Sequence, residues 1–170
     1  DADETVAMLQ ELGVSVASFP ALESEVSKDI VAQRYALLDN LHRKEMPEVL
    51  VASVPALMQK TPSIEQVQSV VKRIRVGDEC SLQTLQHWLV DASYERVETL
   101  DESAQFSLRG GILDIATAAG EFVRLDFFGD TVETMHDVDP VSLGSDCVID
   151  EVILTSATVI ECESHLIEHI

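Results

Sequence analysis

Apolar side chains in residues 1–61 follow two alternating patterns. In some segments they recur at every third or fourth position, the spacing of one helix face, and in others they form short runs typical of buried strands. The pattern predicts helix, strand, helix and strand over 1–13, 14–20, 27–47 and 48–57, with a turn that starts at Pro55. This order favours an α/β fold with a parallel sheet.

Residues 67–78 carry a mixed pattern. Their valines and isoleucine have helical spacing, whereas the alternation over 72–76, with β-branched side chains, is typical of a strand. We favour a strand over 67–78 that ends at its Gly-Asp pair. A clear amphipathic helix follows over 81–93, and Ser81 is placed to cap it.

From residue 94 onward, short alternating segments are separated by turn signals. Strands are expected over 94–100, 104–110, 111–117, 121–128, 130–138 and 147–157. Residues 118–120 and 129–130 are predicted hairpin turns, and Gly110-Gly111 is a predicted bend or bulge within the sheet. The final residues are expected to begin a last helix.

Helix–strand alternation near the ends of the chain and the meander between them define the predicted fold class. We expect an α/β domain in two pieces, residues 1–61 and 148–170, interrupted by an inserted antiparallel α+β unit over 62–147. The 170 residues, 46% of them apolar, are enough to form a core.

The charge balance is strongly acidic. With 31 acidic and 11 basic side chains the formal net charge is −20, and each of the three predicted segments is net negative. Affinity for nucleic acid rests mainly on neutralisation of phosphates by Lys and Arg. Direct DNA binding by this chain is therefore disfavoured.

Motifs of nucleotide binding and of zinc-dependent hydrolysis are absent from the sequence. There is no GxxxxGK[ST] phosphate loop, no GxGxxG and no HExxH. A nucleotide-driven motor needs a phosphate cradle and an acid that holds magnesium, so we expect neither ATP hydrolysis nor a cofactor. The three scattered cysteines favour reduced thiols in a cytoplasmic protein, and no apolar run approaches the roughly 18 residues of a membrane span.

Two small constellations could carry chemistry, but each has a simpler explanation. A C-x2-H-x3-H spacing begins at Cys162 and could hold zinc with a fourth ligand, although a plain surface helix is favoured. Asp114 and Asp126 form a possible carboxylate pair. Ion pairs with Arg109 or Arg124 are favoured over catalysis.

The segment 106–130, FSLRGGILDIATAAGEFVRLDFFGD, places arginine and phenylalanine in an acidic surround. Arg124, Asp126 and Phe128 alternate with apolar residues, so they project from one strand face while the others fill the core. Together with Arg109, that face has the composition of a protein-binding hot spot. The pattern is equally compatible with arginines that only neutralise neighbouring carboxylates and a Phe128 that packs under a loop.

Several separated strings resemble one family in order and spacing. They are SFPALESE, EVLVASVPALMQKTPS, YERVETLDESAQFSLRGGILDI and RLDFFGDTVETMHDVDP. Together they resemble the N-terminal region of bacterial transcription–repair coupling factors, and the later strings also resemble the excision-repair protein UvrB. The resemblance implies that the inserted unit is like UvrB domain 2, which binds UvrA. It also implies that the surrounding portion is a helicase-type α/β domain with degenerate nucleotide motifs.

The resemblance also implies site residues and partners. The family's UvrA-contacting positions fall on Arg109, Arg124 and Phe128. The chain would then be a fragment that recruits UvrA and links stalled transcription to nucleotide excision repair. RNA polymerase and double-stranded DNA would be bound by other domains of an ATP-dependent translocase. The rival hypotheses are a fragment of a UvrB-like ATP-dependent DNA helicase and a module masked within its own polypeptide.

Overall fold

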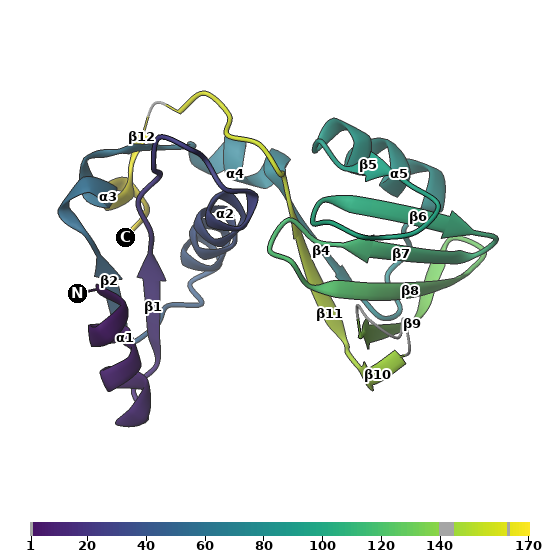
Figure 1. Cartoon of the computed structure of the whole chain (residues 1–170), viewed down its shortest axis with the longest axis horizontal. Helices are drawn as coiled ribbons and strands as arrows, with labels where there is room; N and C mark the ends of the chain where they lie inside the picture. Colours follow the sequence, from purple (N-terminus) through teal and green to yellow (C-terminus); the bar gives the residue numbers. More distant parts are fainter. Residues whose placement is uncertain (1, 140–144, 163) are drawn as a thin grey trace.

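The computed structural model describes residues 2–139, 145–162 and 164–170, which form two lobes joined by a narrow antiparallel ribbon (Figure 1). The ribbon consists of β4 (Val71–Arg75) and β11 (Glu151–Thr155). The first lobe contains α1 (Ala2–Glu11), β1 (Val16–Phe19), α2 (Lys28–His42), β2 (Val49–Ala52), α3 (Val54–Met58), β3 (Lys60–Thr61), α4 (Ile64–Val70), β12 (Ser164–His165) and the 3-10 turn η1 (Leu166–His169).

The first lobe is built around α2 and the parallel pair of β1 and β2. The apolar side of α2, including Tyr35 and Leu38, is buried with Phe19, Val67 and Leu166 in one core. Both strands, both helices and the parallel pairing predicted for this part of the chain are confirmed. The last two elements of the chain, β12 and η1, return to this lobe, where β12 pairs with β3.

Several boundaries in the first lobe differ from the prediction. Helix α2 ends at His42, and Lys44 reverses the chain with a φ of 62°, well before the expected stop at proline. A short helix, α3, replaces the predicted turn because the Ser53 hydroxyl accepts a hydrogen bond from the Ala56 amide and a proline occupies the first helical turn. The last helix is only a 3-10 turn preceded by β12.

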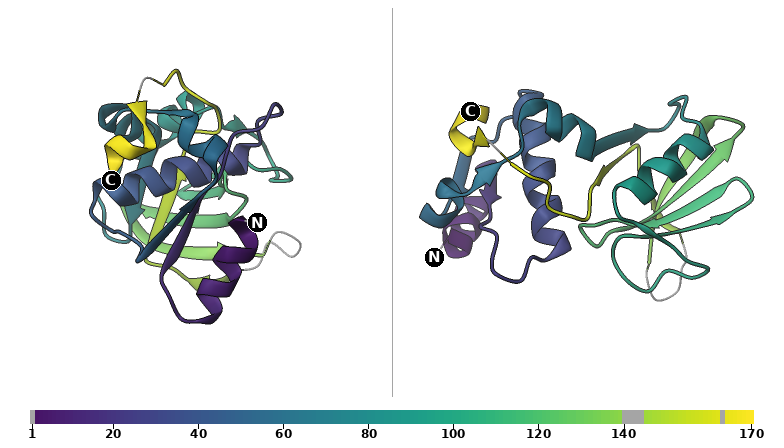
Figure 2. Two further views of the ribbon diagram at one scale, coloured as in Figure 1. Left: turned by 90° about the vertical axis from the view of Figure 1, so that its left-hand side faces the viewer. Right: turned by 90° about the horizontal axis from the view of Figure 1, so that it is seen from above.

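The second lobe is a twisted antiparallel meander with one helix against it (Figure 2). Within the described residues its sheet has the order β10-β9-β8-β7-β6-β5, and only β5 is parallel to its neighbour. Its elements are α5 (Leu82–Asp91), β5 (Glu95–Arg96), β6 (Gln105–Arg109), β7 (Ile112–Ala116), β8 (Phe122–Phe128), β9 (Thr131–Val138) and β10 (Ser145–Val148). Leu85 and Leu89 of α5 are buried in a core with the inward side chains of the sheet.

Residues 67–78 contain a helix and a strand in succession, so the prediction of one strand is wrong for its first part. A capping box starts α4: the Ser63 side chain accepts from the Gln66 amide, and the Gln66 side chain accepts from the Ser63 amide. Val67 and Val70 then bury in the first core, and Ile74 of β4 buries in the second. The two periodicities in the sequence belong to neighbouring elements.

The strand predicted over 147–157 is also divided. Its first residues belong to β10 and pair with β9, whereas β11 pairs with β4 in the ribbon. An ion-pair network joins this ribbon to α2. Arg73 Nε donates to Asp39 Oδ2 at 2.7 Å with both side chains 8% exposed, and Arg73 Nη1 lies 3.6 Å from Glu151 Oε2. Burial opposes the charge of Arg73, but Asp39, Glu45 and Glu151 together outweigh it and raise the pKa of Arg73.

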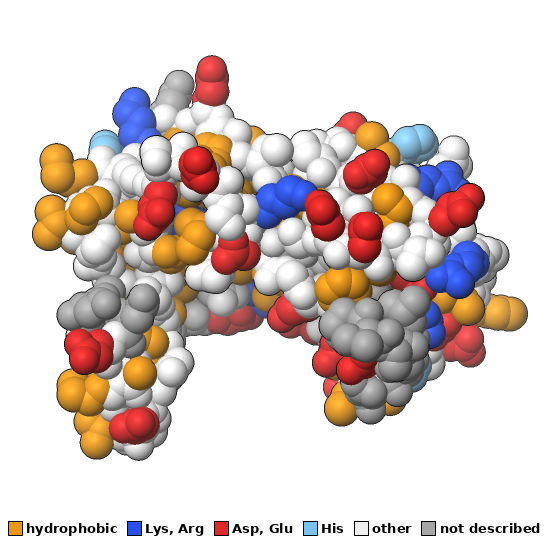
Figure 3. Space-filling model, viewed as in Figure 1, with side chains coloured by type: hydrophobic (Ala, Val, Ile, Leu, Met, Phe, Trp, Pro, Cys, Tyr) orange, Lys and Arg blue, Asp and Glu red, His pale blue; other side chains and the backbone are white. Residues whose placement is uncertain are grey.

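The molecular surface reflects the acidic composition. Red acidic side chains are spread over both lobes in Figure 3, while exposed apolar side chains gather on the first lobe. No described helix is long and apolar enough to cross a membrane. The helices and strands described above are those of a mixed α/β chain with largely antiparallel sheets, and at this coarse level the predicted fold class is confirmed.

Candidate docking face

Strand register determines which side chains share the outer face of the second lobe's sheet. One cross-strand row contains Ser107, Asp114, Arg124 and His136, and the next contains Arg109, Ile112, Asp126 and Thr134. In the row between them, Leu113, Leu125 and Met135 point inward and are fully buried in the core. The two outward rows together with Phe128 form what we call the docking face. The predicted alternation is confirmed.

Asp114 lies at the centre of this face and pairs with both arginines. Arg124 Nε donates to Asp114 Oδ1 at 2.6 Å and Arg124 Nη2 donates to Asp114 Oδ2 at 3.1 Å, a bidentate pair. Arg109 Nη2 lies 3.6 Å from the same Oδ2. The predicted ion pairs of Asp114 are confirmed. The hydrogen bond that Arg124 donates to Asp114, more than any other contact, raises the pKa of Arg124.

Asp126 is engaged separately from Asp114. Thr134 Oγ1 donates to Asp126 Oδ2 at 2.9 Å, and His136 Nε2 lies 3.8 Å from that oxygen. The two carboxylates that the sequence suggested as a possible pair therefore have different partners. This arrangement is that of a surface polar network.

Phe128 is the most prominent apolar group of the docking face. It ends β8 beside the hairpin turn to β9 and is 78% exposed, whereas Phe127 is partly buried against the core. The two residues have different environments on β8, although the strand register shifts between Asp126 and Phe127. The alternative in which Phe128 packs under a loop is wrong.

Gly110-Gly111 is a hairpin turn between β6 and β7, not the predicted bend within the sheet. Gly110 adopts a φ of 63°, and Arg109 pairs directly with Ile112 across the turn. Phe127 then crosses close to the turn, where its amide donates to the Gly111 carbonyl at 2.8 Å. The turn thus positions Arg109 and supports the end of β8 that carries Phe128.

The C-x2-H-x3-H spacing does not form a metal centre. Among the described residues no group of three or more His, Cys, Asp and Glu side chains is arranged to hold a metal ion. His169 instead contacts His42: His169 Nδ1 lies 2.6 Å from His42 Nε2. The other ring nitrogen of His169, Nε2, lies 3.0 Å from Thr61 Oγ1. Its role is to attach the chain's last turn to the first lobe.

A comparison with protein families matches residues 73–159, more than half of the chain, to the UvrB interaction domain. The chain belongs to the UvrB interaction domain family. The matched residues include β11, the last three residues of β4, α5 and the whole docking face. This match and the relatives named next together confirm the resemblance noted from the sequence strings.

Curated relatives of this UvrB interaction domain chain are transcription-repair-coupling factors. The Myxococcus xanthus protein is 32% identical over 136 residues, which cover 78% of this chain and 11% of the relative. The Bacillus subtilis protein is 31% identical over 141 residues, or 79% and 12%. A Staphylococcus aureus protein is 28% identical over 122 residues, or 72% and 10%. The chain spans about a tenth of the length of these relatives.

Two side chains of the docking region were missed by sequence reasoning. Arg96 of β5 and Arg109 line the same open hollow of about 620 Å³ along β6. Ile112 is 41% exposed in the row between Arg109 and Asp126. Arg96 could not be placed because β5 is short and pairs in parallel with β6 across an intervening loop. Ile112 could have been singled out from the sequence, because it directly follows the double glycine.

Proposed function

We propose that this chain is a docking module of a transcription–repair coupling factor that recruits UvrA through the docking face. Recruitment would link stalled transcription to nucleotide excision repair. The observation that carries the proposal is an exposed phenylalanine, Phe128, on the same sheet face as two arginines that pair with Asp114, in a chain of the UvrB interaction domain family. Exposed aromatic and arginine side chains are the commonest anchors of protein interfaces.

The three site residues would have different roles. The Arg109 side chain is 62% exposed and lies 3.6 Å from Asp114, so it can turn toward a carboxylate of UvrA at little cost. Arg124, held by two hydrogen bonds, would present a preorganised positive charge. Phe128 would be the apolar anchor, whose truncation should weaken binding about thirtyfold, or by about 2 kcal/mol.

In the longer protein we propose that other segments contain an ATP-dependent DNA translocase and contact RNA polymerase and double-stranded DNA. We further propose that residues 1–61 and 148–170 belong to a degenerate helicase-type domain and that residues 62–147 are its insertion. The parallel pair of β1 and β2 with α2 beside it supports the α/β character of the first part. The expected location is the cytoplasm.

Calorimetric titration of UvrA into this chain tests the proposal. Phe128→Ala should weaken binding about thirtyfold and leave stability to urea unchanged, because the ring is exposed. Val148→Ala is the matched control, since Val148 is 70% exposed on β10. Arg109→Ala should also weaken binding. Arg124→Ala is less informative, because it leaves the buried Asp114 without its main partner.

The outcomes separate the function from the site. A wild-type chain that produces no heat with UvrA contradicts the proposed function. Binding that survives both Phe128→Ala and Arg109→Ala contradicts the site assignment and leaves UvrA recruitment to another surface.

A further inference from the structure

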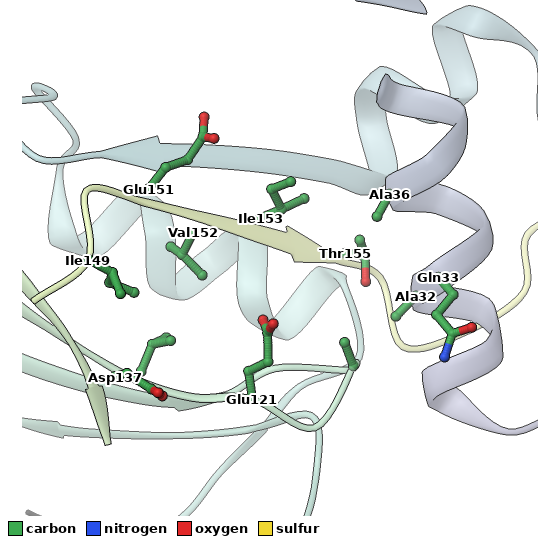
Figure 4. A pocket seen from close by; sticks show the side chains of 12 residues that line it. Ala32, Gln33, Ala36, Glu121, Asp137, Ile149, Glu151, Val152, Ile153 and Thr155 are labelled. Carbon is green, nitrogen blue, oxygen red and sulfur yellow. The ribbon is translucent and has the colours of Figure 1, made fainter. Parts of the chain in front are cut away.

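A hollow of about 450 Å³ lies between α2 and the inner end of the second lobe's sheet (Figure 4). Its walls are mainly small or aliphatic, and α2 contributes alanines that leave the space open. The apolar lining consists of Ala32, Ala36, Ala119, Val123, Ile149, Val152 and Ile153. The hollow is distinct from the docking face, because Glu121 lines it directly before β8 and Phe128 ends that strand.

Carboxylates give the hollow a negative end. Glu121 rises from the sheet toward β11 in Figure 4, and Asp137 lies on β9 opposite Val123. Among the described residues, no Lys, Arg or His forms an ion pair with Glu121 or Asp137. Glu151 also lines the hollow, but Arg75 Nε neutralises it at 2.8 Å. Glu121 and Asp137 are thus two exposed carboxylates beside an apolar slot with no ion-pair partner in the described part of the chain, and Asp137 Oδ1 accepts a hydrogen bond from the Val138 amide.

We propose that this hollow receives a lysine or arginine side chain of a partner protein. The aliphatic stem would pack on Ala36 and Val152, and the cationic head would pair with Glu121 and Asp137. Long basic side chains bury their stems on apolar surface while the head keeps polar contacts. The formal charge of −20 complements a basic partner and disfavours a second copy of this chain.

The probe for this site is the capped peptide acetyl-Gly-Lys-Gly-amide, titrated into the whole ¹⁵N-labelled chain and followed by NMR. Saturable shifts are expected at the amides of Ala36, Asp137 and Val152. The matched control peptide has norleucine in place of lysine, which keeps the aliphatic stem and removes the ammonium group. A response to norleucine equal to that of lysine overturns the proposal, as does the absence of saturable shifts in this region.

Charge-neutral variants test the roles of the carboxylates. The double change Glu121→Gln, Asp137→Asn should weaken the lysine peptide about tenfold, since charge-assisted hydrogen bonds are lost. The control Glu133→Gln, Asp101→Asn makes the same change in net charge at exposed positions outside the hollow. An equal loss in the control overturns the proposal, because the peptide would then respond only to overall charge.

Two further arms keep the site assignment testable. Ala36→Leu fills the slot without changing charge, and it should abolish the shifts in a chain whose circular dichroism is unchanged. Titration with magnesium chloride asks whether a divalent cation is the occupant. Saturable shifts with magnesium but not with the lysine peptide overturn the proposal. None of these arms involves UvrA, so their outcome is independent of the docking face.

Discussion

Asp114 determines how the arginines of the docking face are presented. Its side chain is 10% exposed and makes two hydrogen bonds with Arg124, while Arg109 approaches the same carboxylate from the neighbouring strand. The buried carboxylate of Asp114 thus fixes the orientation of the Arg124 guanidinium, whereas it constrains that of Arg109 only weakly. Preorganisation of this kind lowers the entropy that a partner's binding must overcome.

Replacement of Asp114 should weaken the fold as well as the docking face. Asp114→Asn removes the charge that pairs with Arg124, and we expect a loss of about 1–3 kcal/mol in the free energy of unfolding. Urea denaturation measures it. Asp126→Asn is the matched control on the same face, and it should cost less than about 1 kcal/mol because its partners are partly exposed. Equal losses would contradict the central role of Asp114.

Individual residues were predictable where local alternation decides their environment. The separation of partly buried Phe127 from exposed Phe128 follows from strand alternation, and the structure retains it despite a register shift beside Phe127. The partnership of Arg124 with Asp114 was foreseeable because the two residues lie on adjacent strands of one hairpin. Arg96 was not, because a parallel pairing across a loop leaves no local signal.

At the scale of elements, turn chemistry is decisive in the meander. The predicted turns at 118–120 and 129–130 join β7 to β8 and β8 to β9. The error at Gly110-Gly111 arose because two glycines suit both a bulge and a two-residue turn. Residues 67–78 were misjudged for a different reason: the capping box that starts α4 lies before the ambiguous segment.

Gly111 is required by the close approach of β8 to this turn. A Cβ on residue 111 would lie 2.8 Å from the Phe127 carbonyl oxygen, which belongs to the backbone and cannot rotate away. Gly111→Ala should therefore cost about 1–3 kcal/mol in the free energy of unfolding, measured by urea denaturation.

The control for this prediction is Ala119→Ser, a small change at an exposed position of the next hairpin turn. It should alter stability by less than about 0.5 kcal/mol. A Gly111→Ala chain as stable as this control would show that the turn can shift without cost.

For the whole molecule, the β4–β11 ribbon is the feature that the sequence did not reveal. Residues 147–157 are mostly apolar and a single strand was predicted there, although Asp150 and Glu151 interrupt the run where β10 and β11 separate. Pairing of β11 with β4 depends on contacts between residues more than 70 positions apart, such as Arg75 with Glu151. The buried pair of Arg73 and Asp39 then holds α2 against the ribbon. These long-range contacts give the molecule its two-lobed form.

The contact between His42 and His169 closes the first lobe and should make its stability depend on pH. Their rings lie 4.8 Å apart between centroids. Burial lowers the pKa of His42 despite nearby Asp39, and burial together with His42 lowers the pKa of His169 despite Glu168. Folding therefore disfavours the charged form of both rings, so the unfolded chain binds more protons at mildly acidic pH.

The stability that this histidine pair contributes should accordingly be fully present above the ordinary histidine pKa of about 6.5. It should be lost as the pH falls from there toward the lowered pKa values of the two rings in the folded chain. Urea denaturation between pH 7.5 and pH 5.5 would measure this loss, with the window chosen around that ordinary value. The double variant His42→Gln, His169→Gln should lose most of the slope, whereas His87→Gln, at an exposed position of α5, should keep it. An unchanged slope in the double variant would mean that other groups carry the pH dependence.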